Sequence, residues 1–439
     1  MTIAVHDLAQ LDAAGRAALI ARSEADISDF VGRVGPIIDA VRSRGDDALA
    51  EFGRQFDRAD VQAGALAARP EDFDAAETAL DDEIREAMQF AADRIRRFHQ
   101  RQMPEDLWME EMAPGVMAGE RSLPIPSVAC YVPRGKGAFP SVALMTTIPA
   151  VVAGVPRVIV LTPPTERGGI DDATLHACRL AGVTEVYKCG GAQAVAAAAY
   201  GTETVPKVAK IVGPGSSWVV AAMQALAGVI DVGPPAGPSE SIVLADSSAD
   251  PRRTALDLLN EAEHGDDSSA FLVTDDRQLA GKVAEEVAFL WGHMGAERVG
   301  YSRAVLGGSN GGIVIAADMD EACGFVNDFA PEHLMVESAD PWSYVSRLTH
   351  AGEILLGPST AISVANYVLG PNHVLPTGGW ARTRSPLSVF DYLKRQTVGY
   401  VTAQGLPGLA GHTRAFARYE GFDAHANAVS RLRDGGDAP

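Results

Sequence analysis

The chain has 439 residues, of which 47% are hydrophobic and 21% charged, and its formal net charge is −20 at pH 7. This length exceeds what one hydrophobic core organises, so we expect at least two domains. The acidic excess argues against nucleic acid as a partner, because neutralising phosphates requires a basic surface. No apolar run is long enough to predict a membrane span.

The N-terminus and the cysteines indicate where the protein works. No basic segment followed by an apolar stretch opens the chain, so we predict no secretory signal. The cysteines have neither disulfide nor metal-site spacing, which is typical of proteins in the reducing cytoplasm. They are Cys130, Cys178, Cys189 and Cys323.

Residues 1–126 have a helical, charge-rich pattern. Apolar residues recur at helical spacing over 30–56, with a break at Gly45, and again over 81–102. We therefore predict an N-terminal helical region that ends near residue 126.

From Val128 onward, short apolar strands alternate with helices. This alternation indicates a parallel sheet with right-handed crossovers, and we assign residues 127–236 to one α/β domain. The predicted strands are 128–133, 157–161, 186–189 and 209–212.

Glycine turns follow three of these strands, at 134–137, 190–191 and 213–215. Their backbone N–H groups would lie at helix N-termini, which suits a phosphate. No complete dinucleotide or P-loop motif is present, so a nucleotide crevice and simple tight turns both remain open.

A second α/β domain is predicted over 237–378, followed by a helical tail over 379–439. Its helix over 251–265 ends with Glu261 and His264, which are three residues apart and would share a helical face. A carboxylate and an imidazole in that arrangement can bind a divalent metal. A surface hydrogen bond between them is the ordinary alternative.

Several segments in one order resemble the histidinol dehydrogenase family, from about Arg121 to the end of the chain. The segments are Tyr131-Val132-Pro133, Gly190-Gly191-Ala192-Gln193-Ala194, Ala236-Gly237-Pro238-Ser239, Ala262-Glu263-His264, Ala330-Pro331-Glu332-His333-Leu334 and Asn372-His373-Val374-Leu375-Pro376-Thr377. The resemblance implies an α/β fold with two Rossmann-like parallel-sheet domains and helical terminal segments. It also implies an intertwined homodimer in which residues 379–439 complete an active site.

The activity implied by the resemblance is oxidation of a primary alcohol to a carboxylate through an enclosed aldehyde. NAD would accept the two hydrides, and zinc would hold the substrate. Glu332 and His333 match the family's acid–base pair. An imidazole can take the alcohol proton as hydride leaves, and a carboxylate can then activate water to hydrate the aldehyde.

The cofactor contacts are also assigned by the resemblance. Tyr131 and Gln193 match family contacts to NAD, and Ser216 replaces an Asn of the family pattern. A hydroxyl can still hydrogen-bond a ribose or phosphate, but it has a shorter reach. These residues do not decide between NAD and NADP.

The metal positions depart from the family pattern of Gln, His, Asp and His. The matching residues are Glu261, His264, Asn366 and His425. The two exchanges are reciprocal, so the ligand set keeps one carboxylate, one amide and two imidazoles. We expect Zn²⁺ with Glu261 as the anionic ligand. The alternative is that Asn366 caps a turn and no metal binds.

The substrate side is represented by Ser239, His333, His373 and Glu420. Ile362, however, stands where histidinol-specific members tend to have a carboxylate facing the substrate ammonium. Each lost charge-assisted hydrogen bond removes roughly 1.5–3 kcal/mol. The sequence therefore favours a small-molecule primary alcohol other than L-histidinol. Sulfopropanediol dehydrogenases resemble the same blocks and also lack that carboxylate.

Other possibilities remain open. The substrate could be L-histidinol itself or an anionic diol of the sulfopropanediol type. Alternatively, the protein could be a catalytically silent metal-binding paralog. A zinc hydrolase would use Glu261, His264 and His425 with Glu332 as base, but no His-Glu-x-x-His motif is present.

Overall fold

The computed structural model describes residues 3–21, 27–134 and 137–436. The chain divides into two compact units. The first contains Met1–Gln102 and Ile125–Tyr392, and the second contains Met103–Pro124 and Leu393–Pro439. The second unit is therefore built from two separate segments of the chain. The predicted division, with boundaries at residues 126, 236 and 378, assigned each domain a single continuous segment.

A five-stranded parallel sheet organises one half of the first unit. Its order is β6-β5-β4-β7-β8, so the chain starts in the middle, fills one side, and returns to fill the other. The strands are β4 (Ser127–Tyr131), β5 (Arg157–Thr162), β6 (Glu185–Lys188), β7 (Lys210–Val212) and β8 (Asp231–Val232). The predicted parallel sheet is confirmed. The direction of winding reverses between β4 and β7.

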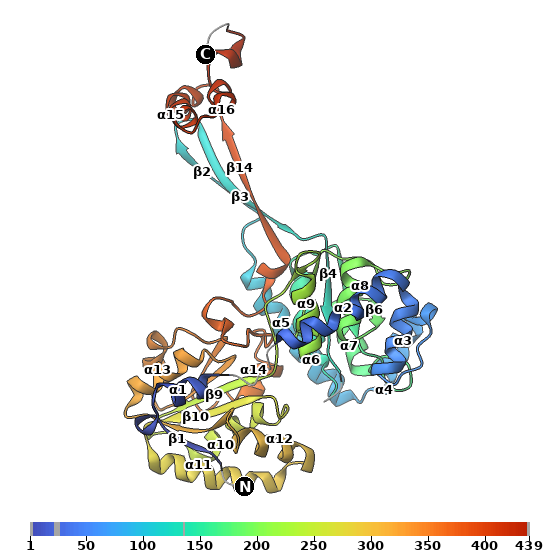
Figure 1. The fold of residues 1–439 in the computed structure, drawn as a ribbon, viewed down its shortest axis with the longest axis vertical. Helices are drawn as coiled ribbons and strands as arrows, with labels where there is room; N and C mark the ends of the chain where they lie inside the picture. Colours follow the sequence, from blue (N-terminus) through green and yellow to red (C-terminus); the bar gives the residue numbers. More distant parts are fainter. Residues whose placement is uncertain (1–2, 22–26, 135–136, 437–439) are drawn as a thin grey trace. The chain divides into compact units, whose positions relative to one another are not determined.

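Helices cover this sheet, and for that reason its strands are almost continuously apolar. They include the two helical stretches predicted in the N-terminal region (Figure 1). The helices are α2 (Ile27–Arg44), α3 (Asp46–Phe56), α4 (Pro70–Ala79), α5 (Asp82–Gln102), α6 (Pro140–Val152), α7 (Asp172–Ala181), α8 (Gly191–Tyr200) and α9 (Ser217–Leu226). The alanine-rich α8 is fully buried along most of its length, since small side chains allow close packing against α2 and α9.

A six-stranded parallel sheet organises the other half of the first unit. Its order is β1-β11-β10-β9-β12-β13, which repeats the winding of the first sheet with β1 added at one edge. The strands are β1 (Val5–Asp7), β9 (Glu240–Ala245), β10 (Ser269–Thr274), β11 (Gly311–Ile315), β12 (His333–Glu337) and β13 (Glu353–Leu356). Here the winding reverses between β9 and β12.

The flanking helices of this sheet are α1 (Ala13–Ile20), α10 (Pro251–Ala262), α11 (Arg277–Leu290), α12 (Ala296–Leu306), α13 (Met319–Phe329) and α14 (Ile362–Tyr367). The sequence analysis did not predict β1, β12, α12 or α14. The strand β12 begins with His333 of the Glu332-His333 motif, and its short apolar run lacks the alternation that identifies a half-buried strand.

The second unit corrects the helical predictions for the terminal regions. Residues 103–126 were expected to be helical, but β2 (Leu107–Ala113) and β3 (Val116–Pro124) form an antiparallel sheet with β14 (Leu393–Val401). Most residues of β2 and β14 are exposed, so no buried face imposes a two-residue hydrophobic period on them. The predicted helical tail begins only afterwards, with α15 (Leu406–Tyr419) and α16 (Asp423–Asn427).

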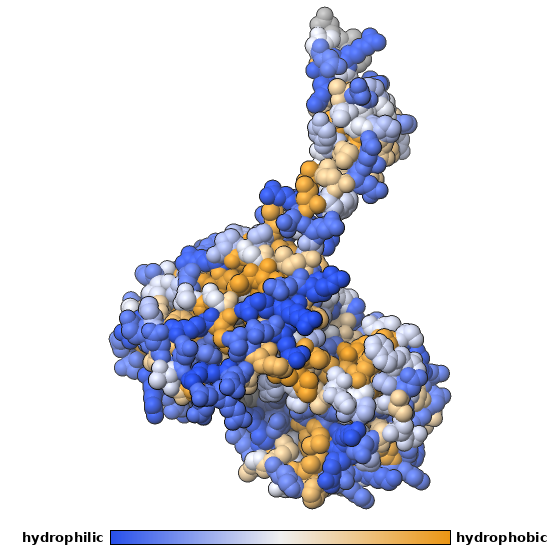
Figure 2. Space-filling model, turned by 180° about the vertical axis from the view of Figure 1, so that it is seen from behind, coloured by the Kyte–Doolittle hydropathy of each residue, from blue (hydrophilic) through white to orange (hydrophobic). Residues whose placement is uncertain are grey.

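The surface combines polar and apolar residues, and Figure 2 shows both kinds on each unit. Among the described residues, no helix combines the length and the hydropathy needed to cross a membrane.

Candidate active site

The predicted acid–base pair lies where β12 begins. Helix α13 ends at Phe329, and its C-cap Ala330 has a left-handed φ of 54°, which is uncommon for a residue with a side chain. Glu332 and His333 follow two and three residues later, and both are buried. Glu332 Oε2 accepts a hydrogen bond from the Glu240 backbone N–H at 3.0 Å, and Glu332 Oε1 lies 3.8 Å from His333 Nε2. The pair is therefore fixed at the amino end of the sheet, beside the reversal point between β9 and β12.

A second acidic residue contacts this pair and was missed in the sequence analysis. Glu353 Oε1 lies 2.6 Å from His333 Nδ1. The contact follows from strand register, because His333 and Glu353 are directly paired residues of β12 and β13. Only a prediction of β12 and of its pairing partner would have revealed it.

A second polar cluster forms around Glu261, at the end of α10. Asn366 Nδ2 donates a hydrogen bond to Glu261 Oε1 at 3.0 Å. Glu261 Oε2 lies 2.8 Å from His264 Nδ1, and Ser239 Oγ lies 2.9 Å from the same nitrogen. Of the four predicted metal ligands, the structure thus brings together Glu261, His264 and Asn366.

The placement of His264 differs in one respect from the prediction. Helix α10 ends at Ala262, with Glu263 as its C-cap, instead of continuing to residue 265. His264 therefore lies in the following turn and does not share a helical face with Glu261. The turn nevertheless directs its imidazole back toward the carboxylate.

The donor atoms of this cluster fit a divalent cation. Asn366 Oδ1 is buried and has no hydrogen-bond partner among the described residues, and the buried Glu261 Oε2 has only the His264 imidazole beside it. Buried polar atoms normally have partners, and a carboxylate, an amide oxygen and an imidazole are all ligands of Zn²⁺ or similar ions. No three His, Cys, Asp or Glu side chains of the described residues form a metal site on their own. The third neighbour here is the Asn366 amide.

Electrostatic interactions couple the two clusters. Burial opposes ionisation of Glu261, but the nearby His264 and His333 hold the pKa of its carboxyl well below the ordinary 4.5. Burial raises the pKa of Glu332 to about 8. Burial also disfavours the charged form of His333, yet the acidic neighbours Glu261, Glu332 and Glu353 outweigh it and raise its pKa to about 10. Glu332 and His333 therefore both retain a proton near neutral pH, and a cation bound at Glu261 would lower the pKa of both.

His373 is the neutral member of the site. Burial and the neighbouring His333 lower its pKa to about 4. Its Nε2 is buried and has no hydrogen-bond partner among the described residues. A neutral imidazole with a free ring nitrogen can bind a polar substrate group.

The predicted cofactor residues surround the reversal point of the five-stranded sheet. Tyr131 ends β4, and its hydroxyl accepts a hydrogen bond from the Gly191 N–H at 3.0 Å. Gln193 is buried in the first turn of α8, and Ser216 is the N-cap of α9 without a capping hydrogen bond from its side chain. Gly213 has a φ of 120°, and an added Cβ would lie 2.2 Å from the Tyr131 carbonyl oxygen. The predicted turn at 134–137 includes residues 135 and 136, which lie outside the described residues.

The carboxyl edge of the six-stranded sheet has the opposite chemistry. Asp246 directly follows β9 and accepts hydrogen bonds from Ser338 Oγ at 2.6 Å and Tyr344 Oη at 2.9 Å. Glu337 ends β12 and is buried beside Asp257. Helices α10, α11 and α13 also begin at this edge, but their N-caps are the carboxylates of Asp250, Asp276 and Asp318. This edge is therefore less suited to a phosphate than the glycine turns of the five-stranded sheet.

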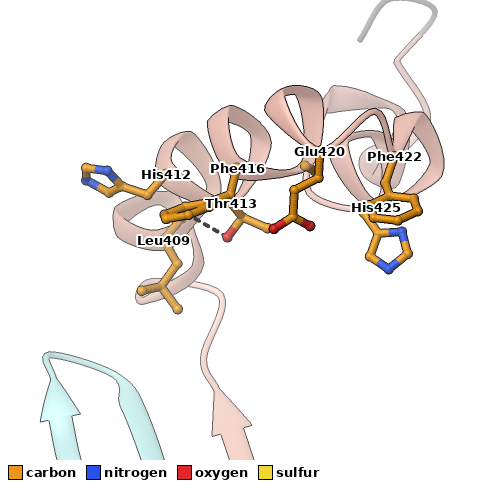
Figure 3. Close-up of a pocket in the computed structure, with 8 residues that line it drawn as sticks. Leu409, His412, Thr413, Phe416, Glu420, Phe422 and His425 are labelled. Carbon is orange, nitrogen blue, oxygen red and sulfur yellow. Dashed lines mark hydrogen bonds between the residues drawn. The ribbon is translucent and has the colours of Figure 1, made fainter.

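The remaining predicted residues, Glu420 and His425, belong to the second unit. They border an open hollow of about 390 Å³ between α15 and α16, and Figure 3 shows both side chains directed toward the same side of these helices. The His425 ring lies 5.2 Å from the Phe422 ring. Tyr419 and Phe416 are 93% and 71% exposed, so α15 presents two large aromatic side chains to solvent.

Comparison with known proteins identifies the family. Residues 20–433 match the model of the histidinol dehydrogenase family. The chain is 55% identical to "Histidinol dehydrogenase homolog 2" of Mesorhizobium japonicum, over 98% of both chains. It is 47% identical to "Histidinol dehydrogenase" of Synechocystis sp., over 93% of this chain and 94% of the relative. A crystal structure of histidinol dehydrogenase from Elizabethkingia anophelis superposes with a TM-score of 0.91 at 32% identity, covering 98% of each chain.

The fold and site thus define an oxidoreductase of mixed α/β architecture with parallel sheets. The chain belongs to the histidinol dehydrogenase family.

Proposed function

We propose that the protein is a zinc-dependent, NAD-linked dehydrogenase that oxidises a primary alcohol to a carboxylate in two hydride transfers. The observation that carries this proposal is the buried Glu332–His333 pair next to the cluster of Glu261, His264 and Asn366. The first cluster can move protons, and the second can hold a cation that binds the alcohol.

The proton chemistry balances over two steps. In the first, the alcohol loses a proton to His333 Nε2 and a hydride to the cofactor, which gives the aldehyde. In the second, Glu332 takes a proton from water as the water adds to the aldehyde, and the hydrate loses a second hydride. One alcohol, two NAD⁺ and one water thus give a carboxylate, two NADH and three protons.

Each bound group has a defined contribution. Zinc at Glu261, His264 and Asn366 would hold and polarise the alcohol oxygen, and NAD⁺ would accept the hydrides. The chain's own residues orient the substrate: Ser239 lies beside His264, and His373 presents an unpartnered ring nitrogen. Tyr131, Gln193 and Ser216 support placement of the cofactor at the β4/β7 reversal point, because ligands of doubly wound sheets bind at the carboxyl ends of strands there.

The substrate is proposed to be a primary alcohol other than L-histidinol. Ile362 is fully buried in the core around α10 and α14, and the Asn366 amide carries no charge. Helix α14 therefore provides no carboxylate for a substrate ammonium. In agreement with this proposal, the relative at 55% identity is named a homolog, whereas the one at 47% carries the plain family name.

The protein is further proposed to act as a homodimer in which Glu420 and His425 complete an active site. The exposed aromatic residues near them support this proposal, since an apolar surface of this kind is typical of an interface.

The decisive experiment is a spectrophotometric screen of NAD⁺ and NADP⁺ reduction. Histidinol, sulfopropanediol-type diols and neutral or amino alcohols would be tested with zinc-loaded and zinc-free protein. We expect two NADH per alcohol with a non-histidinol substrate, and zinc-dependent rates. Preferred turnover of L-histidinol would overturn the substrate assignment. If none of the alcohols reduces NAD⁺ or NADP⁺ although zinc is bound, the protein would be a catalytically silent metal-binding paralog.

A further inference from the structure

The strongest unassigned feature is the acidic side chain on the far side of the His333 ring. Glu353 is the first residue of β13, which lies at the edge of the six-stranded sheet. Carboxylates on edge strands usually face water, yet the Glu353 side chain is only 11% exposed and contacts a His333 side chain that is 4% exposed. The 2.6 Å separation between Glu353 Oε1 and His333 Nδ1 is that of a charge-assisted hydrogen bond.

This contact selects the protonation pattern of the imidazole. A carboxylate only accepts hydrogen bonds, so the nitrogen facing it must be the one that carries a proton. With the proton held on Nδ1, the neutral ring has its lone pair on Nε2. That nitrogen lies 3.8 Å from Glu332 Oε1, on the side where the proposed reaction occurs.

We propose that Glu353 is a positioning residue for His333. Its carboxylate accepts the Nδ1–H hydrogen bond, fixes the ring orientation and tautomer, and stabilises the imidazolium that forms when Nε2 takes the alcohol proton. This inference rests on the proposed dehydrogenase function for its kinetic part, whereas its structural part concerns the ring alone.

Other charged groups also face His333, and they set the background for any pH effect. Glu332 lies directly before β12, Glu261 approaches from α10, and His373 acts from the loop that follows α14. Glu353 differs from these groups in its direct hydrogen bond to Nδ1. Removing it changes the tautomer as well as the local charge.

The test compares Glu353→Gln and Glu353→Ala with Glu337→Gln. Glu337 is a buried glutamate at the end of β12, the strand that begins with His333, so its variant controls for loss of a buried carboxyl. We expect kcat of both Glu353 variants to fall about 10- to 100-fold, the range found when a group that orients a functional histidine is removed. KM should change little, because Glu353 does not contact substrate. The ascending limb of the kcat profile should move to lower pH, since the imidazolium loses its stabilising neighbour.

A second measurement is independent of activity. Nitrogen-15 NMR of histidine-labelled protein distinguishes the two ring tautomers, and His333→Ala identifies the relevant signals. At a pH at which the ring is neutral, we expect the Nδ1–H form in the wild type and a shift toward Nε2–H in Glu353→Ala. An unchanged tautomer, or kinetic losses equal to those of Glu337→Gln, would overturn the inference. If no alcohol reduces NAD⁺ but the tautomer responds, the proposed function fails while the structural role of Glu353 stands.

Discussion

At the scale of single residues, Glu332 and His333 are adjacent in sequence but have separate tasks in the proposed mechanism. Burial raises the pKa of Glu332 to about 8, and the acidic neighbours of His333 raise its pKa to about 10. A carboxyl that titrates near neutral pH is suited to accept a proton from water and release it again.

The first prediction follows from this division of tasks. Glu332→Gln should slow oxidation of the aldehyde about 100-fold or more, within the usual range for losing a general base. Oxidation of the alcohol should be reduced much less, because His333 remains. Stopped-flow rates measured separately with alcohol and with aldehyde would show the difference. Equal losses in the two half-reactions would contradict a water-activating role for Glu332.

The second prediction concerns the reciprocal exchange in the metal cluster. Glu261→Gln removes the anionic ligand, and Asn366→Asp places a second carboxylate 3.0 Å from the first. Each single variant should bind zinc at least about tenfold more weakly, because even indirect partners of metal ligands contribute that much. The double variant restores one carboxylate and one amide, so it should recover most of the affinity.

Competitive zinc titration against a chelator, with metal content measured on the purified protein, would test this prediction. His412→Ala is a matched control, since this histidine borders the hollow of the second unit but is not a proposed ligand. A double variant no better than the sum of the singles would mean that Glu261 and Asn366 do not bind the same ion.

At the scale of elements, α10 and α14 are joined to β12 by a pair of acidic residues. The Ile362 N–H, at the start of α14, donates a hydrogen bond to Asp257 Oδ1 at 3.2 Å. Asp257 in turn shares a hydrogen bond with Glu337, at the end of β12. Two carboxyl groups can share a hydrogen bond only when one of them is protonated. The connection therefore depends on a proton.

The third prediction is a pH dependence of stability that originates in this pair. Burial, assisted by the negative charge of Asp257, raises the pKa of Glu337 from 4.5 to about 7. Between these values the folded state binds more protons than the unfolded state, so the free energy of unfolding should fall as pH rises from about 4.5 to 7. The slope from one such group is at most about 1.4 kcal/mol per pH unit.

Urea denaturation at several pH values would measure this slope. Glu337→Gln keeps a hydrogen-bonding side chain but cannot ionise, so its stability should decline less over the same interval. If the free energy of unfolding depends on pH in the same way in the wild type and the variant, Glu337 is not the source of the pH dependence.

At the scale of the whole molecule, the sequence predicted much of the first sheet and little of the second unit. The strands β4 to β7 are short apolar runs between glycine turns, so their local pattern was sufficient. The strands β2, β3 and β14 are largely exposed, and β14 pairs with a strand far away in sequence. No local pattern records such pairing.

The candidate site shows the same limit. Resemblance to a family supplied Glu332, His333 and the ligand positions, because these lie in recognisable segments. Glu353 lies outside them, and its contact with His333 arises from the register between β12 and β13. The turn of His264 beyond the end of α10 also depends on packing that the helical period does not encode.

The fourth prediction addresses the proposed homodimer. If residues 379–439 of one chain complete the site of another, His333→Ala and His425→Ala should each be inactive as pure proteins. Subunit exchange between them should restore activity, up to about a quarter of the wild-type rate, because half of the dimers are mixed and each mixed dimer has one intact site. Sedimentation analysis would establish the dimer, and NADH formation after exchange would measure recovery. No recovery despite verified exchange would mean that each site is built from one chain.

The second unit is built from two segments that are far apart in the sequence, and this has a consequence during synthesis. The hairpin of β2 and β3 leaves the ribosome early, but its partner β14 begins only at Leu393. At translation rates of about 5–20 residues per second, this strand edge stays open for roughly 15–50 seconds. A nascent chain is exposed to aggregation during that interval. We therefore expect chaperone supply and translation speed to influence the yield of this protein more than the yield of a protein whose paired strands are close together in the sequence.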